Sequence, residues 1–89
     1  MQFEWDENKR RSNLAKHGVD FSDASKVFEG PTLTFEDDRF AYSEQRFITM
    51  GLLQGNVVVV AHTESQNDVR VISMREGTKY EQVIFFENL

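Results

Sequence analysis

The sequence predicts an α+β domain in which helices pack on a twisted antiparallel sheet, with the elements in the order β-α-α-β-β-β-β-α. Three observations support this class. Apolar residues have helical spacing before residue 31, alternate with polar ones or form short runs between residues 32 and 76, and return to helical spacing after Gly77. The 89 residues suffice for one hydrophobic core but not for two, so residues 1–89 are expected to form a single domain.

A short strand and two helices are expected in the first third of the chain. The strand is "FEW" at residues 3–5, and Asp6 is placed to cap the next helix, because its carboxylate can accept hydrogen bonds from the first helical turn. This helix runs through His17 and stops at the following glycine, which tolerates the left-handed conformation of a helix end. The second helix starts near Ser22 and ends at Gly30, before a proline.

Four strands are expected from residue 32 onward. The alternation in "TLTFE" directs Leu33 and Phe35 inward. The next strand, "RFITMGLL", starts at Arg46, and "VVVVAH" at residues 57–62 is the continuous apolar run of a central strand covered on both faces. "VRVISMR" follows, so the last three strands are expected to form an antiparallel meander.

A helix is expected at the end of the chain. "TKYEQVIFFENL" places Tyr80, Val83 and Ile84 at helical spacing. Thr78 and Glu81 stand three residues apart, which is the spacing of a capping box. Glu81 therefore has a structural role available at the start of this helix.

The charge of the chain is unevenly distributed. The net charge is −5, and residues 20–44 account for all of it, with seven acidic residues against two basic ones. The rest of the chain has eight basic and eight acidic residues. A locally basic site can therefore exist on this acidic protein.

Several functional classes are excluded by what the sequence lacks. The absence of cysteine excludes disulfides, thiolate zinc sites and a cysteine nucleophile. No glycine-rich phosphate loop, H-E-x-x-H motif or nucleophile elbow is present, and we expect neither a cofactor nor a metal. No segment approaches the roughly 18 apolar residues needed to span a bilayer, and the amino terminus has no apolar signal region. We therefore expect a cytoplasmic protein with no membrane partner.

Neither histidine indicates a catalytic or metal site by itself. His17 ends a helix, where the helix dipole favours positive charge, so a capping role is the favoured interpretation. His62 is expected at the end of the central strand, with a satisfied hydrogen bond. Acid–base chemistry is the less favoured alternative for both.

The stretch "VRVISMREGTKYE", residues 69–81, combines cations, hydroxyls and a phenol. Guanidinium groups suit the bidentate binding of a phosphate and can stabilise the charge of a pentacoordinate phosphorane. The hydroxyls of Ser73 and Thr78 can donate hydrogen bonds to phosphate oxygens. This is the chemistry of a phosphodiester site, which Arg46 and Lys16 could complete.

The two arginines of this stretch impose a geometric condition on such a site. Residues 70, 72 and 74 of a regular strand share one face and residues 71, 73 and 75 share the other, so Arg70 and Arg75 point apart. Only a bulge or the end of the strand near Ser73 could direct both to one ligand. The alternative is that both form ion pairs, with Glu76, Glu81 or the acidic loop.

Five segments, in order along the chain, resemble the BrnT family of toxins from type II toxin–antitoxin modules. They are "FEWDENKRRSNLAKHGVDFSDASKVF", "TFEDDR", "EQRFITMG", "VVVVAHTE" and "VRVISMREGTKYE". The resemblance implies a RelE-like fold and an endoribonuclease that inhibits translation by cutting RNA, without a metal, through attack of the 2′-hydroxyl on the adjacent phosphate. The implied partners are RNA and a BrnA-type ribbon-helix-helix antitoxin, which neutralises the toxin and through which alone the complex contacts operator DNA.

The residues and the resemblance together predict a catalytic group and an RNA-binding group. The catalytic residues are Arg46, Arg70, Ser73 and Arg75. The RNA-binding residues are Lys16, His17, Thr78 and Tyr80. Arg70 and Arg75 would neutralise the scissile phosphate, and Arg46 would add charge or position the RNA. The chain departs from the family pattern at Glu76, commonly a basic residue, and at Phe85, commonly a tyrosine, and Tyr80 could replace that phenol.

Two functional hypotheses from different classes remain. The leading one is a small ribonuclease toxin held by its antitoxin. The other is a binding module that has lost catalysis and acts through antitoxin binding and co-repression of its operon, so that Arg70 and Arg75 pair with acids of the antitoxin. Under either hypothesis, the acidic segment 20–44 could form the surface for a basic partner.

Overall fold

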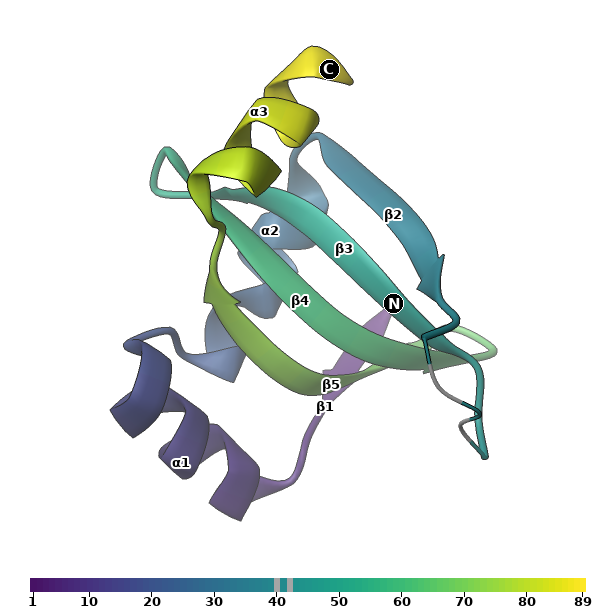
Figure 1. The fold of residues 1–89 in the computed structure, drawn as a ribbon. Coiled ribbons are helices and arrows are strands. Elements are labelled where there is room, and N and C mark those ends of the chain that lie inside the picture. Colours follow the sequence, from purple (N-terminus) through teal and green to yellow (C-terminus); the bar gives the residue numbers. More distant parts are fainter. Residues whose placement is uncertain (40, 42) are drawn as a thin grey trace.

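The structure is a computed structural model that describes residues 1–39, 41 and 43–89. It confirms the mixed α+β class (Figure 1). No helix among the described residues is long and apolar enough to cross a membrane. The elements, in chain order, are β1 (Gln2–Glu4), α1 (Glu7–His17), the 3-10 helix η1 (Phe21–Asp23), α2 (Ala24–Glu29), β2 (Thr32–Asp37), β3 (Arg46–Leu53), β4 (Asn56–Ser65), β5 (Asp68–Glu76) and α3 (Lys79–Glu87).

Over the described residues, the strands form one five-stranded sheet in the order β1-β5-β4-β3-β2. Strands β2 to β5 pair antiparallel. The expectation of a purely antiparallel sheet is nevertheless wrong, because β1 pairs with β5 in parallel, with Phe3 opposite Val69. This pairing joins strands that are more than 60 residues apart in the sequence, and alternation within either strand carries no information about it.

The two faces of the sheet carry separate apolar clusters. Val58 and Val60 of β4 belong to the cluster under α1 and α2, and Val57 and Val59 belong to the cluster under α3, which includes the fully buried Phe85. In Figure 1, α2 lies behind the sheet and α3 lies over its upper end. The central strand is therefore covered on both faces, as its continuous apolar run predicts.

Helix α2 approaches the sheet closely at Gly51 of β3. A Cβ atom at this position would lie 2.6 Å from Cγ1 of Val27. Val27 itself is fully buried. The glycine therefore sets the distance between α2 and the sheet.

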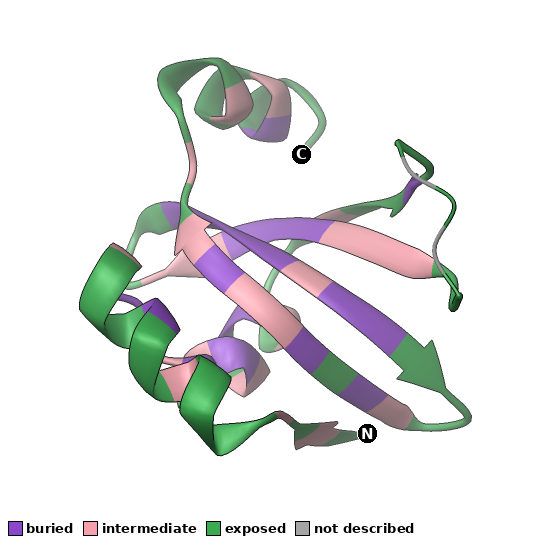
Figure 2. Cartoon of the chain, turned by 60° about the horizontal axis from the view of Figure 1, so that its bottom comes forward, coloured by how far each residue is buried: buried purple, intermediate pink, exposed green. Residues whose placement is uncertain are grey.

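Helix α1 is fixed to the edge of β5 by one buried amide. The Asn13 Nδ2 group donates to the Met74 carbonyl (2.8 Å) and to the Val19 carbonyl (3.1 Å), and the Met74 N–H donates to Asn13 Oδ1 (3.3 Å). The side chain thus pairs with the strand as another strand would, which satisfies backbone groups that β1 is too short to reach. The rest of α1 is mostly exposed, as Figure 2 shows.

Three local expectations were wrong. The second helix starts at Ala24 rather than near Ser22, because Asp20 accepts from the Ser22 N–H (2.9 Å) and caps the 3-10 turn η1 instead. Phe35 does not point into the core: it is 45% exposed, because α3 covers only part of that face. His62 does not end its strand, because β4 continues to Ser65.

His62 is instead a buried part of the core. Its Nε2 lies 2.7 Å from Thr49 Oγ1, which lies 2.7 Å from Thr34 Oγ1. Its ring contacts the rings of Phe28 and Phe47. Burial lowers the pKa of His62 to about 4, so the imidazole is neutral at pH 7.

Candidate functional site

A bulge in β5 brings three of the predicted site residues to one face of the sheet. Ala61 of β4 pairs with Ser73, whereas the next residue, His62, pairs with Val71, so Ile72 is the extra residue. Paired residues on neighbouring strands share a face. Ala61 and Thr63 point to the same face of β4 as Val59, which is the face that bears α3. Their partners on β5, Ser73 and Arg70, therefore lie on that face too.

Arg75 lies on the same face, because it pairs with Val59, a member of the cluster under α3. The bulge thus meets the condition that the sequence imposes on a shared ligand for Arg70 and Arg75. Without it, an odd number of steps would separate the two arginines and place them on opposite faces.

Arg46 joins this face from β3. It pairs with Thr63, which in turn pairs with Arg70, so the two arginines flank one threonine in a row across the sheet. Their Cα atoms are separated by two interstrand spacings, about 10 Å. Asp37 of β2 continues the row and is buried. Arg46 is half-buried, and the Arg70 side chain is 48% exposed and lies 3.5 Å from Glu4 Oε1.

Arg75 forms a bidentate ion pair with Glu81. Its Nη1 donates to Oε1 (2.6 Å) and its Nη2 donates to Oε2 (2.9 Å). The hydrogen bonds from Arg75 and from the Thr78 backbone N–H hold the pKa of Glu81 at about 2. The hydrogen bonds to Glu81 likewise raise the pKa of Arg75, so both groups are charged at neutral pH.

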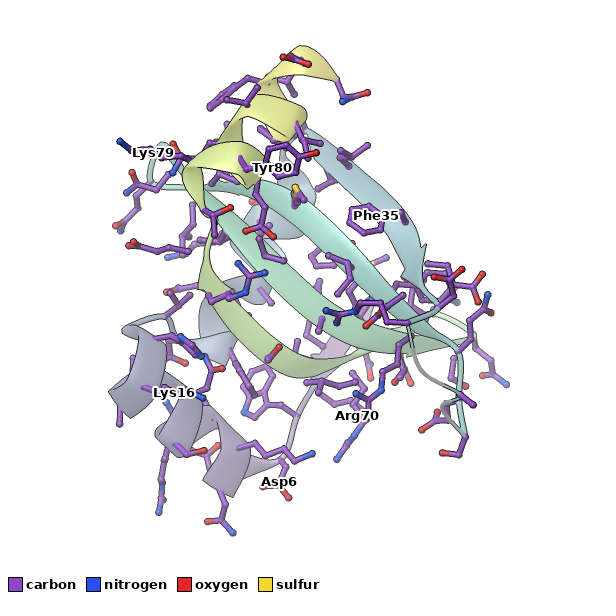
Figure 3. The ribbon with its side chains drawn as sticks, viewed as in Figure 1. Asp6, Lys16, Phe35, Arg70, Lys79 and Tyr80 are labelled. Carbon is purple, nitrogen blue, oxygen red and sulfur yellow. The ribbon has the colours of Figure 1, made fainter. Side chains whose placement is uncertain are left out.

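This face contains a cavity that α3 leaves open. It is lined by Phe35, Glu36, Asp37, Asp38, Arg39, Ile48, Val59, Arg75 and Glu81. Arg39 is close enough to Arg75 for its positive charge to lower the pKa of Arg75, against the larger raising effect of Glu81. Arg39 also donates to both carboxylate oxygens of Asp37, at 2.7 and 2.9 Å. Figure 3 shows Phe35 on β2, Arg70 on the lower part of β5 and Tyr80 at the start of α3, around the open part of the sheet.

A second groove lies between α1 and β5. Its lining residues are Lys9, Ser12, Asn13, Lys16, His17, Ile72 and Ser73. Ser73 therefore borders this groove as well as standing on the face of the arginines. Lys16 and His17, which the sequence placed in an RNA-binding role, lie on the helix side of the groove.

Thr78 and Tyr80 are positioned differently from the arginines. The Thr78 hydroxyl accepts the Glu81 N–H (3.2 Å), which completes the capping box of α3. The capping interpretation of Glu81 is thus confirmed, together with an ion pair to Arg75. Tyr80 is 75% exposed on the first turn of α3 and does not line the cavity with Arg75.

Sequence reasoning missed Phe35 and Arg39 as site residues. The alternation of β2 assigned Phe35 to the core, and the acidic composition of residues 20–44 drew attention away from Arg39, the one arginine of that segment. The available signal was "TFEDDR", Thr34 to Arg39, one of the five segments that carry the family resemblance.

The chain matches a known protein family over most of its length. The model described as "Ribonuclease toxin, BrnT, of type II toxin-antitoxin system" matches residues 5–81. The matched range contains Arg46, Arg70, Ser73 and Arg75, whose common face of the sheet is called the arginine face. It also contains all the residues that line the cavity beside Arg75 and the groove beside α1. No curated protein matches the chain. Because the match covers most of the 89 residues, the chain belongs to the BrnT family of ribonuclease toxins of type II toxin–antitoxin systems.

Proposed function

We propose that the protein is a metal-independent endoribonuclease that inhibits translation by cutting RNA on the open face of the sheet. The observation that carries the proposal is the bulge at Ile72, which places Arg70, Ser73 and Arg75 on one face with Arg46. A phosphodiester is the substrate group that such an array of guanidinium groups and a hydroxyl binds best.

In the proposed reaction, the 2′-hydroxyl of one nucleotide attacks the adjacent phosphorus. The new O2′–P bond forms as the P–O5′ bond breaks, which leaves a 2′,3′-cyclic phosphate and a 5′-hydroxyl. The 2′-hydroxyl loses one proton and O5′ gains one, so the reaction neither consumes nor releases a proton overall. Negative charge accumulates on the non-bridging oxygens of the phosphorane, where Arg70 and Arg75 stabilise it. Ser73 donates a hydrogen bond to the same phosphate, and Arg46 positions the strand.

The flanking nucleotides are assigned to the groove beside α1. Lys16 and His17 lie across this groove from Ser73, so a strand leaving the arginine face can pass between them. Lys16 would bind a neighbouring phosphate as a point charge. Thr78 and Tyr80, at the start of α3, would contact the strand on the opposite side of the site.

We further propose a RelE-like fold in a single domain spanning residues 1–89, and a BrnA-type ribbon-helix-helix antitoxin as the neutralising partner in the cytoplasm. The antitoxin would contribute the contact with operator DNA, because the toxin itself has a net charge of −5. Its acids would compete with RNA for the arginine face.

The deciding experiment is incubation of the purified chain with bulk RNA in EDTA, beside the Arg70→Ala/Arg75→Ala protein. We expect the wild type to cut and the double variant to lose at least about 100-fold in rate, since a single preorganised charge contact is worth this much in comparable sites. The matched control is Arg11→Ala/Lys26→Ala, which removes the same charge from side chains that are 71% and 65% exposed. Equal cutting by both double variants would refute the assignment of the arginines.

One observation favours the alternative of a binding module. Arg75 is already engaged by Glu81, and Arg70 lies near Glu4. In a binding module, the double variant would weaken the antitoxin complex without altering RNA decay. Measuring both antitoxin affinity and RNA cleavage on the same variants separates the two functions.

A further inference from the structure

The cavity beside Arg75 exposes an aromatic ring at the place where a nucleotide would extend from the arginine. Phe35 is 45% exposed and lines the same cavity as Arg75 and Arg39. Leaving so much of a Phe side chain in water forgoes part of the roughly 2 kcal/mol that its full burial would contribute. Leu33, on the same face of β2, is less exposed than Phe35, because it packs against the cluster under α3.

The ring of Phe35 and the guanidinium of Arg75 border one cavity from β2 and β5, which are three spacings apart in the sheet. Phe35 pairs with Ile48, Ile48 pairs with Ala61, and Ala61 pairs with Ser73, so Phe35 and Ser73 lie in one row of the sheet. Their strands are three spacings apart, about 14 Å between Cα atoms. Arg75 lies in the next row on this face, opposite Val59, and its long side chain lines the same cavity as the ring of Phe35.

The floor and the rim of the cavity favour a base rather than a second phosphate. Ile48 and Val59 provide an apolar floor between Phe35 and Arg75. Glu36 and Asp38 stand on the rim near Phe35, and Asp37 is paired with Arg39. Carboxylates repel a phosphate but accept hydrogen bonds from the amino groups of bases. The Phe35 end of the cavity has three carboxylates, Glu36, Asp37 and Asp38, against Arg39, which gives −2, whereas at the other end Arg75 balances Glu81. A phosphate is therefore favoured at the Arg75 end.

We propose that Phe35 forms a base-stacking subsite for single-stranded RNA, in which one base lies on the exposed ring while its phosphate binds Arg75. The inference rests on the proposed function and adds the form of the substrate. Duplex RNA is excluded from this subsite, because a base must be unstacked from its neighbours to lie on a protein ring. The subsite accepts any of the four bases, because every base has a π-face.

The test measures binding rather than cleavage. The probes are short 2′-O-methyl oligonucleotides, which lack the attacking hydroxyl, either intact or with an abasic site moved one position at a time. The proteins are the wild type, Phe35→Ala, Phe35→Tyr, Phe35→Leu and the control Phe86→Ala. Phe86 is 52% exposed on α3 and borders a different cavity, so it matches Phe35 in size and exposure.

We expect Phe35→Ala to weaken binding of the intact oligonucleotide by about tenfold, as for loss of one stacked base. Phe35→Tyr should bind as the wild type does, Phe35→Leu should resemble Phe35→Ala, and Phe86→Ala should have no effect. One abasic position should weaken binding to the wild type by a similar factor and leave the affinity of Phe35→Ala unchanged. Thermal unfolding of each variant verifies that it is folded.

Four outcomes would overturn the inference. If Phe35→Ala weakens binding of intact and abasic oligonucleotides equally, Phe35 acts through the fold and does not stack. If RNA binding is unchanged but antitoxin affinity falls, the ring belongs to the protein partner. If the wild type cuts RNA and Phe35→Ala binds normally, the subsite fails while the proposed function stands. A wild type that neither cuts nor binds RNA would overturn both.

Discussion

Arg75 at the end of β5 and Glu81 in the first turn of α3 form a bidentate ion pair, with N–O distances of 2.6 and 2.9 Å. The same carboxylate accepts the Thr78 backbone N–H at 2.9 Å. One side chain therefore caps the helix and orients the guanidinium. A guanidinium has five N–H donors, so the pair with Glu81 fixes the orientation of Arg75 through Nη1 and Nη2 while Nε makes no bond to Glu81.

Glu81→Gln should lower the free energy of unfolding at pH 7 by about 1–2 kcal/mol. Glutamine can keep the capping bond, so the loss comes from the ion pair, and it is moderate because the Arg75 side chain is 41% exposed. The folded-state pKa of Glu81, about 2, lies below its usual value of 4.5. The stabilisation is therefore complete above pH 4.5 and is lost as the pH falls toward 2.

Urea unfolding at pH 7 and pH 3 measures this effect, with Glu87→Gln as the control on the last turn of α3. The wild type should lose more stability than Glu81→Gln between the two pH values. Parallel losses in the two proteins would show that the ion pair contributes nothing to the folded state.

Arg75→Lys should reduce RNA cleavage by about 10-fold to 100-fold while the protein remains folded. Lysine keeps the positive charge but cannot make two parallel hydrogen bonds to a phosphate. Single-turnover rates on one RNA substrate measure the change, with Arg11→Lys on α1 as the control. Full activity of Arg75→Lys would show that only charge is needed at this position.

Asn13→Ala should destabilise the protein by about 3 kcal/mol. The substitution leaves the Met74 N–H and carbonyl, together with the Val19 carbonyl, without their partner in a buried region. Chemical denaturation measures the loss. The control is Ser12→Ala, because that exposed hydroxyl bonds to the Lys9 carbonyl one turn earlier. A cost for Asn13→Ala below 1 kcal/mol would mean that water replaces the amide at the strand edge.

The stability of the protein should fall by about 2 kcal/mol between pH 7 and pH 5 because of His62. The pKa of His62 is about 4 in the folded protein and 6.5 in the unfolded chain, so the unfolded state binds the proton first. The loss begins near pH 6.5 and continues to about pH 4. His62→Phe, which keeps a planar ring in the core, should show a flat profile from pH 7 to pH 5. An unchanged profile in His62→Phe would assign the pH dependence to other groups.

Gly51→Ala should cost about 1–3 kcal/mol, because the added methyl group would collide with Val27. Gly30→Ala is the control, since a Cβ there meets no atom within 4 Å and the backbone is extended. Thermal unfolding of both variants measures the difference. Equal melting temperatures would mean that α2 shifts away from the sheet without cost.

The local features that the sequence predicted correctly depend on neighbouring residues. Asp6 accepts from the Lys9 N–H, Gly18 has the left-handed conformation that ends α1, and Thr78 with Glu81 forms the capping box. Each involves groups no more than four positions apart, so residue type and spacing are sufficient to predict it. The cations and hydroxyls of residues 69–81 could likewise be recognised from residue type alone.

The features that the sequence did not reveal join segments distant along the chain. The parallel pairing of β1 with β5 and the attachment of α1 to β5 through Asn13 connect residues more than 60 positions apart. The exposure of Phe35 depends on how far α3 extends over the sheet. No periodicity within a strand contains this information, because period two gives the face of a residue but not what covers that face.

Residue types and their spacing predicted the helices and strands, the helix caps and a set of side chains that are chemically suited to binding phosphate. Arg70 and Arg75 share a face because of the fold, in which the extra residue Ile72 changes the register of β5 against β4. The fold also leaves this face partly uncovered by α3 and brings Glu81 into an ion pair with Arg75. The physical reason is that residue type fixes what a side chain can bind, whereas register and packing fix which side chains can bind the same ligand.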